Sequence, residues 1–585
     1  HAMFLMLFAF VFYPGYSKEK RKRKLIPIQD GILILLAVTV FGYIIINYQR
    51  VAMSGGFLNQ TDLIIAGMGI VLVLEAGRRT SKNLAILALI FLLFNWFGQY
   101  VPGALGHSGF TLKRVLSHMF WGSQGIFGVG IGVSATYIFI FVLFGSFLKY
   151  SGFSQFINDI SLTLVGRSPG GPAKVAVIAS ALLGMINGSA IANVATTGTI
   201  TIPLMKKTGY KAEFAGAVEA VASTGGQFAP PIMGAVGFVM AEFLGISYTK
   251  VMVAAFLPAF LYYLGIMVSV HFEAKKLGLK GLSKENIPNA LVVMKERGHL
   301  IIPLVVLMAM MALEYTPLFS AVAALFATVI SSWFRKETRM DLKTIMLATA
   351  EGARSAVGVG VSCVLIGLII GTVSLTGLGL NFGYVILDVV GEGQLFLGGF
   401  MVMIMSTILG MGVPGVAAYV IVAAVAVPVL INVGATPMAS HMFCLIYACL
   451  SNITPPVAMS SYVAAGIAES NQTKTSLIAV KLGITGFILP FFFLNNPVLL
   501  FGSVEGISAL TTIRTLITAS IGVICLAAGI EGMFLRKCSV FTRILLIAIG
   551  LLSIDPNIQT DILGIILLVI IIIIQKRNKN EILPV

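Results

Sequence analysis

The segment 174–211 places the strongest constraint on the fold, because it is apolar in its interior and carries basic residues at both ends. Basic residues favour the cytoplasmic side of a membrane, so both ends are predicted to lie there. The roughly 30 residues between them allow two helical limbs of roughly 20 Å each, shorter than the roughly 30 Å hydrocarbon core. The segment therefore predicts a re-entrant hairpin over 174–206, with its tip at Asn187-Gly188-Ser189.

The composition identifies a membrane protein with many spans. Of the 585 residues 58% are hydrophobic and 11% charged, and the mean hydropathy is +0.98. A soluble domain does not have this composition. The net charge of +16 comes mostly from short basic clusters between apolar runs, such as 18–24. Such clusters set the topology of a membrane chain and do not form a nucleic-acid surface.

A break is predicted in the apolar helix that follows the hairpin. Gly225, Gly226, Pro230 and Pro231 interrupt it, and such residues free backbone amides and carbonyls inside the membrane. These groups require a partner, such as a cation, a substrate or the neighbouring hairpin. A simple proline kink is the alternative.

The same pattern occurs again later in the chain. A second apolar hairpin is predicted over 395–433, with a central stretch 410–415, and a second break over 451–456. Pro230-Pro231 and Pro455-Pro456 stand 225 positions apart (230 and 455). The second hairpin has no basic residue at either end, which predicts that it enters from outside, and five predicted crossings separate the two hairpins. Inverted repeats with interrupted helices are typical of secondary transporters.

The expected fold class is an all-α polytopic membrane protein, with scaffold helices and an inverted-repeat transport domain. The expected units begin with a four-helix scaffold over 1–110, connecting, arm and scaffold helices over 111–165 and the first repeat over 166–271. Scaffold and arm helices follow over 272–394, among them a surface helix over 341–354 that leads into an outward crossing. The second repeat over 395–495 and extra C-terminal helices over 496–585 complete the chain.

The chemistry of the two breaks favours an anionic substrate and a coupling cation. Half-helices direct positive amide ends into a shared cavity, and neutral oxygens suit a hard cation. Neither break carries a carboxylate, which favours sodium over a proton. Glu219, a little over one turn before the first break, is the alternative proton site, or it is hydrogen-bonded to the hairpin.

Three motifs lie around the first hairpin and break, namely 184–198, Thr208-Gly209-Tyr210 and Gln227-Phe228-Ala229-Pro230-Pro231. They resemble the motifs of the tripartite ATP-independent periplasmic (TRAP) transporters. The chain resembles the form in which the small and large membrane subunits are fused, and the TAXI branch. The first 110 residues would then be the small-subunit-like part.

The resemblance implies an elevator mechanism and coupling to an ion gradient, usually sodium. It also implies an extracytoplasmic TAXI-type substrate-binding protein as partner, and a location in the cytoplasmic (inner) membrane of a bacterium or archaeon. Each tip would form one cation site with the break of its own repeat, with the substrate between the two sites.

The candidate site residues follow from these two lines of reasoning. The candidate substrate-binding residues are Asn187, Gly188, Ser189, Gly225, Gly226, Gln227, Pro230, Pro231, Val413, Pro414, Thr454 and Pro455. The candidate cation ligands are Asn187, Ser189, Thr224, Gly226, Gly410, Gly412, Ser451, Asn452 and Thr454.

The expected function is binding-protein-dependent import of a small organic anion, of the dicarboxylate or acidic amino acid class, without a cofactor. A primary pump is disfavoured because the sequence has no G-x-x-x-x-G-K-[ST] loop. An intramembrane enzyme is disfavoured because it has neither H-E-x-x-H nor G-x-S-x-G. A permease with separate ATPase chains would not need two inverted hairpins. A proton-coupled carrier of the same fold and a channel with re-entrant loops remain as alternatives.

Overall fold

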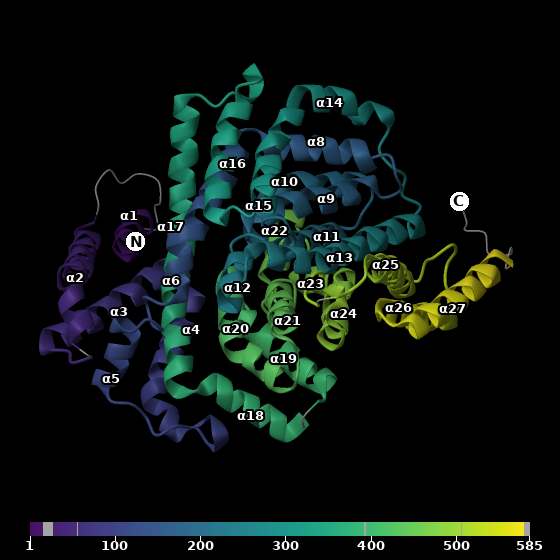
Figure 1. Cartoon of the computed structure of the whole chain (residues 1–585). Helices are drawn as coiled ribbons and strands as arrows, with labels where there is room; N and C mark the ends of the chain where they lie inside the picture. Colours follow the sequence, from purple (N-terminus) through teal and green to yellow (C-terminus); the bar gives the residue numbers. More distant parts are fainter. Residues whose placement is uncertain (16–26, 55, 391–392, 505, 578–585) are drawn as a thin grey trace.

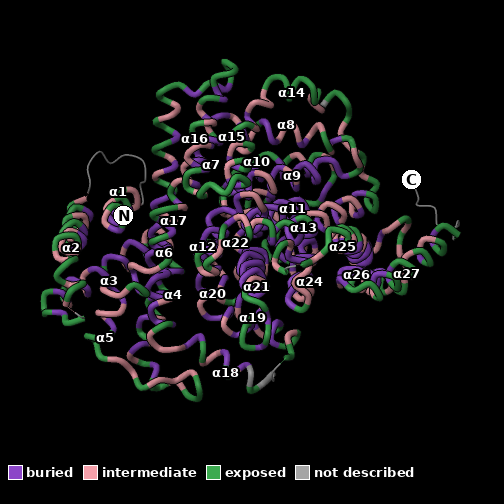
Figure 2. Tube along the Cα trace, viewed as in Figure 1, coloured by how far each residue is buried: buried purple, intermediate pink, exposed green. Residues whose placement is uncertain are grey.

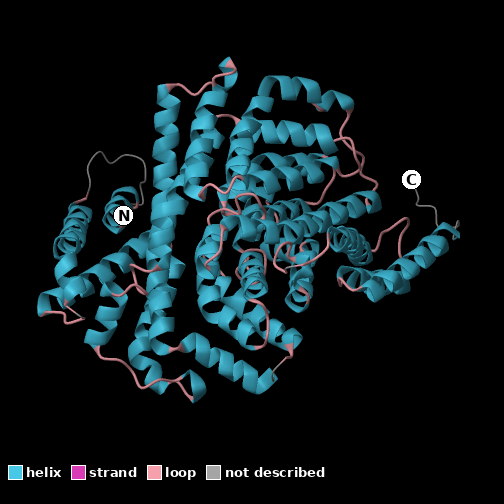
Figure 3. Ribbon diagram, in the orientation of Figure 1, coloured by secondary structure: helices cyan, strands magenta, loops and turns pink. Residues whose placement is uncertain are grey.

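The computed structural model describes residues 1–15, 27–54, 56–390, 393–504 and 506–577 (Figure 1). Within these ranges the chain forms helices, turns and loops but no β-strand (Figure 3). By length and composition, nine of the described helices are suited to cross a membrane, or ten if the bent pair Gln472–Leu482 and Ile484–Asn495 is one span. The expected all-helical fold is confirmed. The basic cluster 18–24 lies outside the described residues.

The N-terminal helices form one side of the molecule. They are α1 (Ala2–Phe12), α2 (Ile28–Met53), α3 (Gln60–Thr80), α4 (Lys82–Phe97) and the short α5 (Leu112–Leu116). Buried Arg79 on α3 pairs with Asp30 on α2 at 2.7 Å and with Glu75 at 2.7 Å. Buried charges need such partners, so this cluster fixes α2 against α3.

The long helix α17 (Leu342–Thr376) connects the N-terminal side with the rest of the molecule. It packs against α3, α4, α7 (Phe139–Tyr150), α20 (Gly415–Asn432) and α1. The sequence predicted a separate surface helix over 341–354, and this was wrong. Asp341 caps the helix by accepting from the backbone amide of Thr344 at 2.8 Å. No proline interrupts the following 35 residues, so they form one continuous helix that ends at Gly377, whose φ is +67°.

Both predicted hairpins are present. The first consists of α9 (Gly171–Asn187) and α10 (Ala190–Lys207), and the second of α19 (Leu395–Gly410) and α20. Gly188 ends α9 with a left-handed φ of +63°, and the Ser189 hydroxyl caps α10 by accepting from the amide of Ala192. The turn therefore follows from the local chemistry of Asn187-Gly188-Ser189. That the hairpins re-enter the membrane, and from which side each one does so, stays a prediction.

Both predicted breaks are also present. The first separates α11 (Ala212–Gly225) from α12 (Val236–Leu244), and the second separates α21 (Pro437–Leu450) from α22 (Met459–Ala468). The Pro230-Pro231 and Pro455-Pro456 peptide bonds are cis. After each broken helix the chain continues into helix with an internal proline: α13 (Tyr248–Lys276), and α23 (Gln472–Leu482) with α24 (Ile484–Asn495). The order of elements thus repeats.

The remaining helices lie around these repeats. They are α6 (Val129–Val133), α8 (Phe153–Val165), α14 (Ala290–Arg297), α15 (Ile302–Ala312), α16 (Pro317–Ser332), α18 (Leu378–Val390), α25 (Ala509–Glu531), α26 (Val540–Ile554) and α27 (Ile558–Arg577). The sequence did not predict α14 and α18. Figure 2 shows burial concentrated in α11 and α21, inside the repeats, whereas α2 and α27 are exposed along much of their length.

Candidate functional site

The first hairpin tip lies directly on the first helix break. A Cβ atom built on Gly226 would lie 2.4 Å from the carbonyl carbon of Gly184, so the two backbones touch. The Gly234 amide donates to the Met185 carbonyl at 3.0 Å. Gly188 approaches Gly234 equally closely, since a Cβ on Gly188 would lie 2.7 Å from the Gly234 Cα. Only glycine permits these contacts.

The second tip lies on the second break in the same way. A Cβ atom on Gly410 would lie 2.7 Å from the Ser451 hydroxyl oxygen. Gly410 corresponds to Gly184, because each glycine lies between a leucine and a methionine in its hairpin. Asn83 on α4 donates to the carbonyl of Gly412 at 3.4 Å, so an N-terminal helix also touches this tip.

Gln227 joins the two halves of the site. Its side-chain amide donates to the Gly188 carbonyl at 3.4 Å, and the same nitrogen lies 2.1 Å from the position of a Cβ on Gly415. Its oxygen, Oε1, is buried and has no hydrogen-bond partner among the described residues. This side chain therefore lies between the first break and both tips.

The two tips open into one central cavity of about 240 Å³. Asn187, Gly188 and Ser189 of the first tip line it together with Pro414 and Gly415 of the second. The opposite wall comes from other helices and carries hydroxyl groups from Thr80, Ser81, Ser355 and Ser362. The hydroxyls of Ser81 and Ser362 lie 3.0 Å apart. Among the described residues, no Lys or Arg side chain lines this cavity.

A second cavity of about 360 Å³ adjoins the central cavity. The residues that line both are Val142, Ile186, Asn187, Ser189, Ser355 and Val359. The second cavity continues toward Lys149 and Glu351, which form an ion pair at 2.5 Å. Lys149 is in the last turn of α7, and a basic residue there predicts that this end is cytoplasmic.

The structure brings some of the predicted substrate-binding residues to the central cavity and packs others behind it. Asn187, Gly188, Ser189 and Pro414 line the cavity, whereas Gly225 packs against the rings of Tyr262 and Tyr263. The carbonyl of Pro231 accepts from the Tyr248 hydroxyl at 2.8 Å. Val413 is buried, and Pro230, Thr454 and Pro455 are half-buried at the breaks.

The predicted cation ligands lie at the tips and breaks, but most of their polar groups already bond to the adjacent helix. The Thr224, Ser451 and Thr454 hydroxyls donate to backbone carbonyls of the preceding turn at 2.8, 2.6 and 2.8 Å. The Asn452 amide nitrogen donates to the Cys449 carbonyl at 3.1 Å. Hydroxyl oxygens that donate one hydrogen bond keep lone pairs for a cation.

Glu219 on α11 is fully buried against the first hairpin. Ser180 donates to its carboxylate at 2.7 Å, Thr201 at 2.6 Å and Ser223 at 3.2 Å, and Thr197 forms a fourth hydrogen bond. Among the described residues it forms no ion pair. The prediction that it is hydrogen-bonded to the hairpin is confirmed, and a proton role stays a proposal.

A chain of amides links this carboxylate to the central cavity. Asn187 at the tip donates to the Asn193 side-chain oxygen at 3.2 Å, and the Asn193 nitrogen donates to the Ser223 hydroxyl at 2.9 Å. Sequence reasoning did not select Asn193, nor the hydroxyl groups around Glu219. The spacing of Asn193, Thr197 and Thr201, four residues apart on one helix, was the available signal.

Comparison with known proteins gives the family. The family model of the tripartite ATP-independent periplasmic transporter, DctM component, matches residues 68–507, so the match begins within the N-terminal four-helix stretch. The isethionate TRAP transporter permease protein DctMQ of Oleidesulfovibrio alaskensis is 25% identical over 60% of this chain and 57% of its own length. This chain thus spans less than two thirds of that relative. A putative TRAP transporter large permease protein of Haemophilus influenzae is 23% identical over 62% of this chain and 84% of its own length.

A solved structure shares the fold. The YdaH transporter of Alcanivorax borkumensis, whose topology is described as unusual, superposes with a TM-score of 0.52 at 16% identity, covering 70% of this chain and 98% of its own. The family model covers well over half of the residues. The chain therefore belongs to the DctM-component family of TRAP transporters, a family of membrane permeases and not of enzymes.

Proposed function

We propose that the protein is the permease of a secondary active transporter that imports a small organic anion by an elevator mechanism. One observation carries the proposal: both hairpin tips line the same cavity, and each tip packs on the helix break of its own repeat. The opposite wall of the cavity is formed by other helices. A transport unit built from the two repeats would move relative to those helices and carry the cavity across the membrane.

An anionic substrate is supported by the way the hairpins end at the cavity. The N-terminal ends of α10 and α20 lie there, at Ser189 and at Pro414-Gly415. Each helix end supplies roughly half a positive charge, which favours a carboxylate or sulfonate. Known relatives are named for isethionate, sialic acid and C4-dicarboxylates, all of them organic anions. The volume of about 240 Å³ fits a dicarboxylate or an acidic amino acid.

Sodium as the coupling ion is supported by the neutral oxygens at both breaks. Ser189→Ala, Thr224→Ala and Asn452→Ala each remove an oxygen or its local hydrogen bond, worth about 0.5–1.5 kcal/mol. Each is expected to raise the sodium concentration for half-maximal uptake. The measurement is uptake into proteoliposomes at graded sodium. Unchanged sodium dependence in all three variants would place the cation sites elsewhere.

Proton coupling is the second candidate, and Glu219 is the observation that favours it. A buried carboxyl group that receives four hydroxyl hydrogen bonds can be held in either protonation state. Asn193 and Ser223 link it to the cavity. Glu219→Gln keeps the shape and cannot carry a proton. Under sodium coupling the variant keeps sodium-driven uptake within about threefold of the unmodified protein. Loss of uptake driven by a pH gradient, with exchange of substrate retained, would establish proton coupling.

A soluble partner completes the proposed function. TRAP permeases work with extracytoplasmic substrate-binding proteins, and we propose one of the TAXI type for this chain, in the inner membrane of a bacterium or archaeon. The decisive experiment is uptake of labelled anions into proteoliposomes with the binding protein added outside or omitted. Full-rate uptake without it would contradict the dependence on a partner. Uptake without saturation, independent of any gradient, would indicate a channel.

A further inference from the structure

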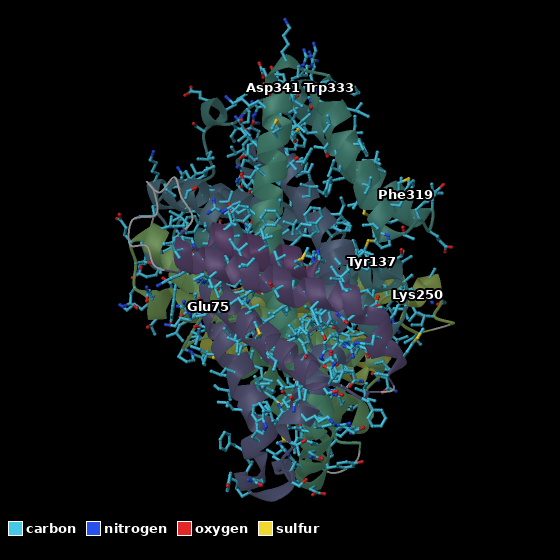
Figure 4. The ribbon with its side chains drawn as sticks, turned by 90° about the vertical axis from the view of Figure 1, so that its left-hand side faces the viewer. Glu75, Tyr137, Lys250, Phe319, Trp333 and Asp341 are labelled. Atoms are coloured by element: carbon cyan, nitrogen blue, oxygen red, sulfur yellow. The ribbon has the colours of Figure 1, made fainter. Side chains whose placement is uncertain are left out.

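A third cavity, of about 470 Å³, lies beside the central one and is here called the outer pocket. It is lined by the end of α12, the start of α13 and the α15–α16 connection, with Lys250 and Glu314 among its polar residues. In Figure 4, Tyr137 and Lys250 lie near each other at this pocket. The opposite end of α13 carries Lys275 and Lys276 and is predicted to be cytoplasmic, so the outer pocket faces outside.

A cluster of four aromatic rings lies between the outer pocket and the central cavity. The Phe238 ring is at its centre, 5.5 Å from the ring of Tyr137, 4.3 Å from Phe141 and 4.1 Å from Tyr248, measured between ring centroids. Phe141, Phe238 and Tyr248 are buried. Gly237 permits the closest of these contacts, since a Cβ there would lie 2.7 Å from the Tyr248 ring. We call these four side chains the aromatic partition.

On each side of the partition, two residues about one helical turn apart line different cavities. On the α12 side, Ala235 lines the central cavity and Phe238 lines the outer pocket. On the α7 side, Phe141 lines the central cavity and Tyr137, four residues earlier, lines the outer pocket. The rings therefore stand where the two cavities would otherwise join.

The partition is made by two separate parts of the molecule. Tyr137 and Phe141 belong to the α6–α7 segment, which packs on α17, whereas Phe238 and Tyr248 belong to the first repeat. The Tyr248 hydroxyl donates to the carbonyls of Pro231 and Ile232 at 2.8 Å, so this ring is fixed to the first break and moves with it. A displacement of the repeat relative to α7 would therefore separate Phe238 and Tyr248 from Tyr137 and Phe141.

We propose that the aromatic partition is the outer seal of the substrate cavity, closing it from the extracytoplasmic side while the adjoining cavity near Lys149 leaves it open to the cytoplasm. This inference rests on the proposed function. In this proposal, Tyr137, Phe141, Phe238 and Tyr248 separate the extracytoplasmic side from the cytoplasm. A coupled transporter requires such a separation, and an open channel lacks it. Removing a ring would connect the outer pocket with the central cavity.

The test measures access to the cavity and needs no transport. Ser355 is exposed and lines both the central and the adjoining cavity, so Ser355→Cys provides a thiol reporter. A membrane-impermeant cationic methanethiosulfonate is added to either side of full-length protein in oriented proteoliposomes, and labelling at position 355 is identified by peptide mass spectrometry. We expect labelling from the cytoplasmic side and at least tenfold slower labelling from outside.

Phe238→Ala and Tyr137→Ala, added separately to the reporter, are each expected to raise the outside labelling rate at least tenfold. The two variants remove rings from the two different parts of the molecule that form the partition. If one variant fails to fold, the other still tests the proposal. Phe243→Ala is the matched control, because Phe243 is on α12 but contacts Tyr419 and His441. It is expected to leave the rate unchanged.

Rapid outside labelling of the reporter alone, or no increase in either ring variant that retains cytoplasmic labelling, would overturn the seal. A seal that behaves as expected in a protein that shows no uptake with any binding protein would overturn the proposed function instead.

Discussion

The contact between the first tip and the first break leads to a quantitative prediction for Gly226→Ala. The added Cβ would lie 2.4 Å from the carbonyl carbon of Gly184, 2.6 Å from its Cα and 2.8 Å from the Met185 nitrogen. Ordinary contact begins near 3.4 Å, so the two segments must separate by about 1 Å. All three atoms are backbone, so no side-chain rotation relieves the overlap.

The expected cost follows from two opposing effects. Overpacking of a close-packed interior costs about 1–3 kcal/mol. Replacing glycine at a backbone conformation that alanine accepts, as at Gly226 with φ −58°, recovers about 0.4–1 kcal/mol. The net loss of stability is therefore between about 0 and 2.6 kcal/mol, which leaves the protein folded. Uptake should fall at least tenfold, because the tip that lines the cavity is displaced.

Gly466→Ala is the control. Gly466 lies on an exposed face of α22, and a Cβ there would meet nothing within 4 Å. This variant should show unchanged uptake and equal or higher stability, since alanine favours helix over glycine by roughly 1 kcal/mol. The assays are proteoliposome uptake with the binding protein and thermal unfolding in detergent. Normal uptake by Gly226→Ala at normal stability would refute the inferred close contact.

Three further variants test other contacts. Gln227→Ala removes the side chain between the two tips. It should weaken apparent substrate affinity in a binding titration by roughly 2–12-fold, the equivalent of one hydrogen bond of about 0.5–1.5 kcal/mol. Unchanged affinity would show that the Gln227 side chain does not act on the substrate. Tyr248→Phe loses the hydrogen bonds to the first break and should lower thermal stability by a similar energy, and an unchanged melting temperature would contradict this. Lys481→Met removes the ion-pair partner of the buried carboxylate of Glu531, which lies 2.6 Å from the lysine. It should destabilise by about 1–3 kcal/mol, less than for a fully buried pair because Lys481 is 41% exposed, and Lys481→Arg is the control that keeps the ion pair.

The hairpins and breaks were predictable because their signals are local. Gly188 requires a left-handed φ, Ser189 caps a helix, and Pro230-Pro231 cannot continue one. The continuity of α17 was not predicted, because the polar stretch at its start resembles a surface helix until its packing on α7 is known. The Lys149–Glu351 ion pair, which joins residues 202 positions apart, shows that packing.

The site was predictable only on the side of the hairpins. Thr80, Ser81, Ser355 and Ser362 reach the central cavity from two helices and the α3–α4 junction, far from the motifs. No local pattern distinguishes these hydroxyls from others in apolar helices, because their position depends on tertiary packing. The cluster of hydroxyl groups around Glu219 was partly predictable. Its helical spacing is visible in the sequence, but the pairing of α9, α10 and α11 that brings the hydroxyls together is not.

The attachment of the C-terminal helices has a consequence for the membrane around the protein. α25 packs on α13 of the first repeat, and Lys481 of the second repeat pairs with Glu531 at its end. In Figure 1, α26 and α27 lie on the side of the molecule away from α1–α5. If the repeats move as an elevator, these three helices move with them. The exposed apolar face of α27 would then displace lipid during every transport cycle. The turnover rate of the transporter would therefore depend directly on the viscosity of the bilayer.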